Sequence, residues 1–315
     1  MISPFRRLPR RISFGLGIRP GIARALLSLL TLAPLACGSG ADVVVGSKNF
    51  TESIILGEIV AQQLEGAGLT VDRRFNLGGT FICHEAIGAG QIDVYVEYTG
   101  TAHAAILELP TERDQAIVRS QLDSVYATRW ALEWTAPLGF NNTFAMLVQG
   151  DAAARHGLKT YSDVGRFAAE WRPGFGYEFA QRADGYQGLS DAYGFRFERQ
   201  PAVMDIGLTY RALAQGQVDI IAGNSTDGQI AALGLVQLAD DRSYFPTYDA
   251  VPVVRSESLE DHPEVRGLLD ALGGTIDEEA MRSMNYRVDV ERSPIREVAR
   301  EFLNGISADP ERAPL

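Results

Sequence analysis

Cysteine is scarce in this sequence, which excludes a fold that depends on disulfides. Only Cys37 and Cys83 occur among 315 residues, and Cys37 adjoins an N-terminal segment that we expect to be removed. We therefore expect Cys83 to be the only free thiol and the mature chain to have no intrachain disulfide. A chain of roughly 275 residues can bury a sufficient core without one, and that length suits two domains better than one.

Metal-binding and catalytic motifs are also missing. The four histidines have no ligand spacing, and the adjacent Cys83 and His84 cannot both face one metal ion from a helix. The sequence has no Gly-x-Ser-x-Gly motif, and Cys83 has no accompanying His/Asn signature. We therefore predict no metal, no cofactor and no enzymatic activity. A periplasmic enzyme on a two-lobed scaffold is the alternative of another class, since a fold does not fix a function.

The N-terminus lacks acidic residues and is rich in arginine. Six arginines precede residue 25, and a mostly apolar run covers residues 21–36. This order predicts a signal peptide over residues 1–36, because the run is short of the about 20 residues that a membrane span needs. Leu35-Ala36-Cys37 also resembles a lipoprotein cleavage box. Lipidation of Cys37 and plain cleavage therefore both stay open, as do the general secretory and twin-arginine routes.

Positive charge is in deficit over the rest of the chain. The formal net charge is −11, and it becomes −17 once residues 1–36 are removed with their six arginines and no acidic residue. An acidic mature chain argues against nucleic-acid binding. We expect a monomeric protein outside the cytoplasm, either periplasmic or anchored to the membrane.

One segment occurs twice, 126 residues apart, as EAIGAGQIDVYVEYTG at 85–100 and RALAQGQVDIIAGNST at 211–226. Each copy has the end of a helix, a glycine, Gln-(Ile/Val)-Asp, a short apolar strand and a polar loop. One copy in each half predicts two similar lobes. The strand ends Tyr98-Thr99 and Asn224-Ser225 are candidate ligand positions, because open α/β sheets bind ligands beyond the carboxyl ends of their strands. The Asp that opens each strand is interpreted as a capping or turn residue.

The pattern along the chain predicts an α/β fold with mostly parallel sheets. A strand over 42–46 is followed by a helix, for which Asn49 and Glu52 have the spacing of a capping box. A second strand over 70–77 precedes a helix that runs to Gly88. Residues 111–134 are expected to form a long amphipathic helical region.

We expect the chain to cross from one lobe to the other twice. We assign residues 37–140 and 244–315 to lobe one and residues 141–243 to lobe two, so that the two crossings between them form a hinge. Aromatic residues gather at the predicted loops and strand ends. Several aromatic rings can hold a quaternary ammonium group, at about 0.5–2 kcal/mol per ring, and the backbone N–H groups at Gly78-Gly79-Thr80 can hold a carboxylate.

Five ordered motifs resemble a known family over roughly residues 42–303. They are Val45–Glu52, Leu77–Thr80, Gln91–Thr101, Pro137–Thr143 and Ser225–Gly228. The chain resembles the quaternary-amine (glycine betaine/choline-type) substrate-binding proteins of ABC importers. The resemblance implies a two-lobed, type II periplasmic-binding-protein fold that closes on a small ligand and docks on a membrane permease, without catalysing a reaction.

The resemblance and the strand-end argument together give a set of candidate ligand-binding residues. They are Asn49, Thr51, Thr80, Tyr95, Tyr98, Thr99, Asn141, Asn142, Tyr177, Phe179, Tyr186, Asn224, Thr226 and Asp227. Asn224 departs from the pattern, since an aromatic residue there would complete a cage around a cation. The expected ligand is a quaternary-amine osmoprotectant such as glycine betaine or choline, and the alternative is an amino acid or another polar osmolyte. A sensor or permease-fused module is less expected, because no second hydrophobic segment occurs.

Overall fold

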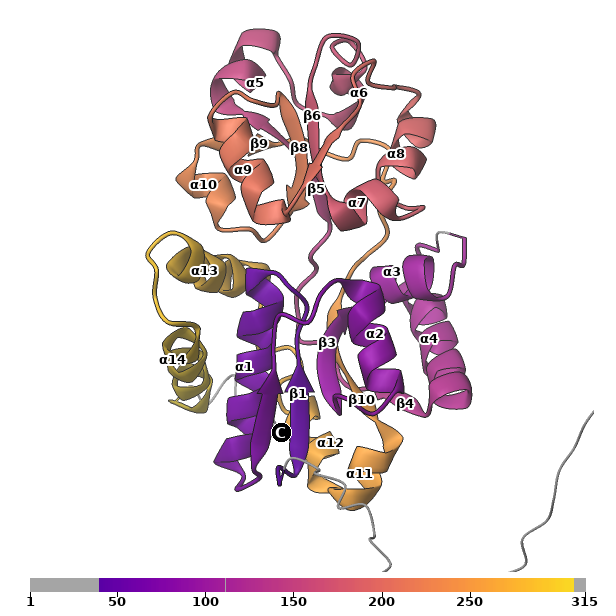
Figure 1. Ribbon diagram of the computed structural model, residues 1–315, viewed down its shortest axis with the longest axis vertical. Coiled ribbons are helices and arrows are strands. Elements are labelled where there is room, and N and C mark those ends of the chain that lie inside the picture. Colours follow the sequence, from indigo (N-terminus) through magenta and orange to yellow (C-terminus); the bar gives the residue numbers. More distant parts are fainter. Residues whose placement is uncertain (1–39, 111, 309–315) are drawn as a thin grey trace, which may run out of the picture. The chain divides into compact units, whose positions relative to one another are not determined.

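A computed structural model describes residues 40–110 and 112–308 (Figure 1). The predicted signal peptide and Cys37 lie outside these residues. Within them, no helix has both the length and the apolar composition that a membrane span requires.

The first sheet combines strands from both ends of the described chain. Its strand order is β2-β1-β3-β10-β4, so β10 lies between two strands that precede it by more than 100 residues. The strands are β1 (Val43–Gly46), β2 (Val71–Arg74), β3 (Val94–Tyr98), β4 (Leu132–Trp134) and β10 (Ala250–Arg255). The chain therefore returns to the first sheet at residue 250.

Helices cover both faces of the first sheet. One buried core lies between the sheet and α1, α12, α13 and α14, and a second lies between the sheet and α2 and α4 (Figure 1). The helices are α1 (Thr51–Gly66), α2 (Thr80–Gly88), α3 (Thr99–Thr101), the π-helix η1 (Ala102–Ile106), α4 (Gln115–Trp130), α11 (Ser256–Asp261), α12 (Glu264–Asp270), α13 (Glu278–Asp289) and α14 (Ile295–Ala308).

The second sheet has the strand order β7-β6-β8-β5-β9 and also has a buried core on each face. Its strands are β5 (Phe144–Gln149), β6 (Pro173–Gly176), β7 (Ala202–Met204), β8 (Ile220–Asn224) and β9 (Leu235–Gln237). Its helices are α5 (Gly150–His156), α6 (Tyr161–Val164), α7 (Tyr177–Gln181), α8 (Tyr186–Tyr193), α9 (Ile206–Ala214) and α10 (Gln229–Ala232). Residues 135–143 and 238–249 connect the two sheets.

The expectation of mostly parallel sheets holds for strand direction, since four of the five strands of each sheet run the same way. Each sheet has two parallel and two antiparallel strand pairs. The antiparallel pairs all involve β5 or β10, the strands that follow the two connecting segments. Each of these strands begins beside the carboxyl ends of the parallel strands. It must therefore run in the opposite direction.

Two local expectations are corrected. The helical region over 111–134 is α4 followed by β4, because Ala131 adopts a left-handed conformation with φ of 52° and ends the helix. Helix α1 has Phe50 at its N-cap and no side-chain cap. The capping box of Asn49 and Glu52 does not form, because Glu52 is turned into the interior.

The repeated segment adopts the same hydrogen bonds in both sheets. Gly90 and Gly216 end their helices with φ of 68° and 66°, a conformation that glycine adopts without steric penalty. Asp93 accepts a bond from the backbone N–H of Val44, and Asp219 accepts one from the backbone N–H of Arg172. Each aspartate therefore ties the start of its strand to the neighbouring parallel strand, which confirms a structural role for both.

Candidate functional site

A cavity of about 150 Å³ lies at the carboxyl ends of the parallel strands of both sheets. Aromatic side chains from both sheets and from one connecting segment line it: Phe50, Tyr98, Phe144, Tyr177, Phe179 and Tyr248. Polar and charged side chains complete the wall: Lys48, Asn49, Thr101, Asn142, Glu178, Arg182, Asp205 and Asn224. The strand ends that the sequence singled out, Tyr98 and Asn224, thus lie on one cavity wall.

A buried ion pair lies beside Tyr98. Lys48 and Glu97 are 2% and 0% exposed, and the Lys48 Nζ lies 2.5 Å from a carboxylate oxygen of Glu97. The Lys48 Nζ also donates to the hydroxyl of Thr80, and the Tyr95 hydroxyl and the Tyr98 backbone N–H both donate to Glu97. A buried charge pair needs such extra hydrogen bonds to offset its desolvation, and here they fix the end of β3.

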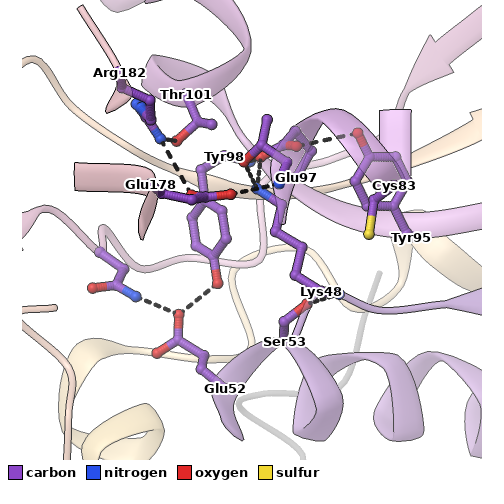
Figure 2. A network of polar contacts seen from close by, with 12 residues as sticks. Lys48, Glu52, Ser53, Cys83, Tyr95, Glu97, Tyr98, Thr101, Glu178 and Arg182 are labelled. Atoms are coloured by element: carbon purple, nitrogen blue, oxygen red, sulfur yellow. Dashed lines mark hydrogen bonds and ion pairs between the residues drawn. The ribbon is translucent and has the colours of Figure 1, made fainter. Parts of the chain in front are cut away.

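Glu52 holds the Tyr98 side chain from the other side. Figure 2 shows the Tyr98 hydroxyl pointing at the Glu52 carboxylate, to which it donates over 2.7 Å. The same carboxylate accepts bonds from Asn142, Thr226 and Asn285. Four donors match the acceptor capacity of one carboxylate, and they come from the first sheet, a connecting segment, the loop after β8 and α13. Glu52 therefore joins both sheets behind the cavity wall.

Arg182 is the second buried cation of the site. It is 5% exposed and forms a bidentate pair with Asp184, and it also donates to the Thr101 hydroxyl. Its guanidinium carbon lies 5.0 Å from the ring centroid of Phe144 and 5.9 Å from that of Tyr248. The Lys48 Nζ lies 5.3 Å from the ring centroid of Tyr98. Three of the aromatic rings on the wall therefore already hold a cation of the protein itself.

Glu178 is a further charged residue of the cavity wall and lies at the start of α7. Its carboxylate accepts the backbone N–H of Thr80 across the two sheets. A Cβ at Gly79 would lie 2.5 Å from that carboxylate, so glycine there permits the contact. Burial raises the pKa of Glu178, but the charges of Lys48 and Arg182 outweigh it and hold that pKa below its usual value. Glu178 thus carries a negative charge at the cavity.

Burial also shifts the pKa values of several other groups. It raises the pKa of Glu52 against the opposing effect of its hydrogen bonds, and it raises the pKa of Asp227 to about 7. Burial also raises the pKa of the Cys83 thiol to about 12 and lowers that of His84 to about 4. These last two side chains lie on α2 away from the cavity, and among the described residues no group of His, Cys, Asp or Glu could hold a metal ion.

The structure brings six of the candidate residues together on the cavity wall. They are Asn49, Tyr98, Asn142, Tyr177, Phe179 and Asn224. Tyr177 is 57% exposed, whereas Tyr98 and Phe179 are almost fully buried. These residues come from five different segments of the chain, so the folded arrangement places them at one site.

Four further candidates stand behind the wall or in a core. Thr80 accepts from Lys48, which is a wall residue, and Thr226 donates to Glu52, which lies behind the wall. Tyr95 is buried under the first sheet beside Glu97, and Tyr186 packs against rings in the core of the second sheet.

The remaining four candidates serve other contacts. Thr99 and Asn141 bond to the segment 247–249 that leads into β10. Thr51 donates to Asp289, and Asp227 accepts from the Tyr210 hydroxyl. Thr51 and Asp227 line a second cavity next to the first.

Six charged residues of the site were missed as candidates. They are Lys48, Glu52, Glu97, Glu178, Arg182 and Asp205. A signal existed for Glu97, because it is the only charged residue in the apolar strand 94–98 and a buried charge needs a partner. Lys48 and Glu52 lie inside one of the family motifs, but the capping-box interpretation assigned Glu52 to the helix end.

The chain is similar to proteins of known function. It matches the model of the substrate-binding domain of ABC-type glycine betaine transport systems over residues 41–305. A glycine-betaine-binding protein of Pseudomonas aeruginosa is 36% identical over 82% of this chain and 86% of its own length. The ergothioneine transport permease/ergothioneine binding protein EgtU of Helicobacter pylori is 34% identical over 88% of this chain, which spans only 50% of that relative.

A solved structure of the same family is also similar to this chain. The crystal structure of a glycine betaine/carnitine/choline ABC transporter protein aligns with a TM-score of 0.70 and 30% identity, covering 84% of this chain and 98% of that one. The prediction of a two-lobed type II periplasmic-binding-protein fold is confirmed, as is the prediction that the protein is not an enzyme. The chain belongs to the family of substrate-binding proteins that serve ABC importers of the glycine betaine type.

Proposed function

We propose that this chain binds a small quaternary-amine solute, such as glycine betaine, carnitine or choline, in the strand-end cavity and delivers it to an ABC permease. The supporting observation is that aromatic rings from both sheets converge on a cavity that also contains the Glu178 carboxylate. A quaternary ammonium group cannot donate a conventional N–H hydrogen bond, so ring faces and a nearby negative charge are the groups that can hold it. The names of the relatives agree with this ligand class.

The two ends of the ligand meet different walls. Phe144 and Tyr248 already flank Arg182, and Lys48 lies over the ring of Tyr98. We therefore assign the cationic group to the three remaining rings, Phe50, Tyr177 and Phe179. An anionic or hydroxyl end suits the Arg182 guanidinium and the side-chain amides on the wall. An arginine presents N–H donors in the planar arrangement that a carboxylate accepts.

We further propose that the two sheets, with their helices, close on the ligand about residues 135–143 and 238–249. Closure is favoured only by contacts that depend on both lobes. The bonds from Thr80 to Glu178, from Arg182 to Thr101 and from Thr226 to Glu52 are of this kind. They support a closed form whose stability the ligand increases.

Calorimetry on the purified mature protein tests the ligand class. We expect heat of binding with glycine betaine, carnitine or choline, and none with ordinary amino acids. Tyr177→Ala should weaken binding roughly 2- to 30-fold, the range that corresponds to one cation–π contact. The exposed position of Tyr177 means that thermal stability should change little.

Tyr186→Phe is the matched control. Tyr186 lies in the core of the second sheet, so this variant should bind like the wild type. Unchanged affinity in Tyr177→Ala would exclude a role for this ring in holding the cation.

An amino acid is the second candidate ligand, because one wall places opposite charges close together. A guanidinium nitrogen of Arg182 lies 3.8 Å from a carboxylate oxygen of Glu178, and such a pair can bind an α-carboxylate and an α-ammonium group. Binding of an unmethylated amino acid without any heat from quaternary amines would favour this candidate.

We also propose that residues 1–36 are removed during export and that the mature protein is a monomer that does not bind nucleic acid. The arginine-rich, apolar and small-residue order of the N-terminus supports cleavage. Mass spectrometry of the protein from membrane and periplasmic fractions distinguishes a lipidated Cys37 from a plain N-terminus, and light scattering measures the oligomeric state.

A further inference from the structure

The loop after β8 meets helix α13 of the other lobe (Figure 1). The Thr226 hydroxyl donates to the Glu52 carboxylate, and the side-chain amide of Asn285 donates to the backbone carbonyl of Thr226 over 2.9 Å. Thr226, Glu52 and Asn285 are each at most 1% exposed. The loop over residues 225–228 therefore makes a solvent-excluded contact with the first lobe.

Gly228 brings two stretches of backbone together in this contact. It has φ of −62° and ψ of −23°, a conformation that any residue adopts, so the local backbone does not require a glycine. A Cβ at Gly228 would lie 2.4 Å from the backbone N and Cα atoms of Tyr286. Backbone atoms inside a helix cannot move aside as a side chain can. The close approach of α13 therefore explains the glycine, and a larger residue would force the two lobes apart.

This contact is separate from the strand-end cavity. Glu178 and Arg182 also bond across the lobes, and both line that cavity. Among the described residues, those that line the cavity do not include Thr226, Gly228 or Asn285. The contribution of the loop and α13 to closure therefore does not depend on which solute is bound.

We infer that residues 225–228 and α13 form a latch, which favours the closed form whether or not a solute is present. The inference rests on the lobe closure proposed above. The latch keeps a fraction of the ligand-free protein closed, and the affinity for a solute that binds the closed form rises with that fraction. Thr226, Gly228 and Asn285 thus change the affinity for every solute by one common factor, whereas the cavity wall selects between solutes.

Two variants weaken the latch in different ways. Gly228→Ala adds a Cβ against the α13 backbone, and it should weaken the binding of glycine betaine and of choline roughly 5- to 150-fold. Thr226→Val keeps the side-chain volume but removes the donor to Glu52, and it should weaken both roughly 10- to 150-fold. Calorimetry measures the affinities. Gly165→Ala is the matched control and should bind like the wild type, because a Cβ there would make only ordinary contacts, at 3.7 Å or more.

Spin labels measure the latch without any solute. Ser283→Cys and Ala231→Cys place labels on exposed positions of α13 and α10, and the thiol of Cys83 is buried. Electron-spin distance measurements on the ligand-free protein should show a short-distance population. Gly228→Ala and Thr226→Val should reduce this population, and the control should not.

Label distances that stay the same in both latch variants would overturn the inference. Affinity losses that differ between glycine betaine and choline would also overturn it, because such a difference requires contact with the solute. Absence of binding by both solutes would instead overturn the proposed function, and the label distances would then decide the inference by themselves.

Discussion

The two copies of the repeated segment are alike at their base, where the strand begins, and differ at their tip, where the strand ends. At the base, Asp93 and Asp219 accept equivalent backbone bonds from neighbouring strands. At the tip, Glu97 and Tyr98 of the first copy correspond to Gly223 and Asn224 of the second. The first tip carries a buried charge and a ring, whereas the second carries neither.

This difference teaches how one scaffold supplies two chemistries. Glu97 pairs with Lys48 and fixes the backbone of Tyr98. A Cβ at Gly223 would lie 2.0 Å from the Tyr210 hydroxyl, so the second copy has no room for a side chain at that position. The first sheet therefore provides a rigid aromatic wall, and the second provides a narrower strand end that leaves space beside Asn224.

The largest effect is expected from breaking the buried pair of the first tip. Lys48→Met leaves Glu97 charged and fully buried, and such a loss destabilises a protein by about 3–5 kcal/mol. Urea unfolding measures the change in free energy. The double variant with Glu97→Gln should recover part of the loss, because it removes the uncompensated charge.

The control is the only other lysine of the chain. Lys159 is exposed and lies on the second sheet's side, so Lys159→Met should change the free energy of unfolding by less than about 0.5 kcal/mol. Equal losses in the two single variants would show that the ion pair at the first tip does not stabilise the fold.

The base of the repeat was predictable from the sequence, and the tip only in part. Glycine, a strand-opening aspartate and an apolar run are local signals, and they correctly placed the helix ends and strands of both copies. The long-range contacts left no local trace. Glu52 meets donors from residues 46 to 233 positions away, and its spacing from Asn49 imitated a capping box. The direction of β5 and β10 likewise follows from the connecting segments.

The next largest effect is expected at the bases of the two copies, and it tests whether they are equivalent. Asp93→Ala and Asp219→Ala each leave a backbone N–H without its acceptor, at a cost of about 1–3 kcal/mol. Because the two aspartates occupy equivalent positions, the two losses in free energy of unfolding should be similar. Asp219 also pairs with the Arg172 side chain through two oxygens, whereas Asp93 has the Ser258 hydroxyl and a longer contact to Arg255.

Asp219→Asn and Asp93→Asn separate these contributions. An asparagine keeps an acceptor for the backbone N–H but loses the charge, so the asparagine at 219 should cost more than the one at 93. A large loss at 93 with none at 219 would contradict the equivalence of the two copies.

The smallest effect concerns Asp227, whose counterpart in the first copy is the uncharged Thr101. Burial raises the pKa of Asp227 from the ordinary value of an aspartate to about 7 in the folded protein. A carboxyl group with a raised folded pKa favours folding while it is protonated, and this contribution is lost as the pH rises from about 4 to about 7.

Asp227→Asn removes the titration but retains an acceptor for Tyr210 and the Asn224 backbone. The variant should therefore match the wild type near pH 4 and exceed its free energy of unfolding by about 1 kcal/mol at pH 8, a value reduced for solvent screening of this half-buried group. Asp151→Asn, at an exposed position, controls for the change of net charge. A difference between Asp227→Asn and the wild type that does not grow between pH 4 and pH 8 would show that this charge does not oppose folding at the second tip.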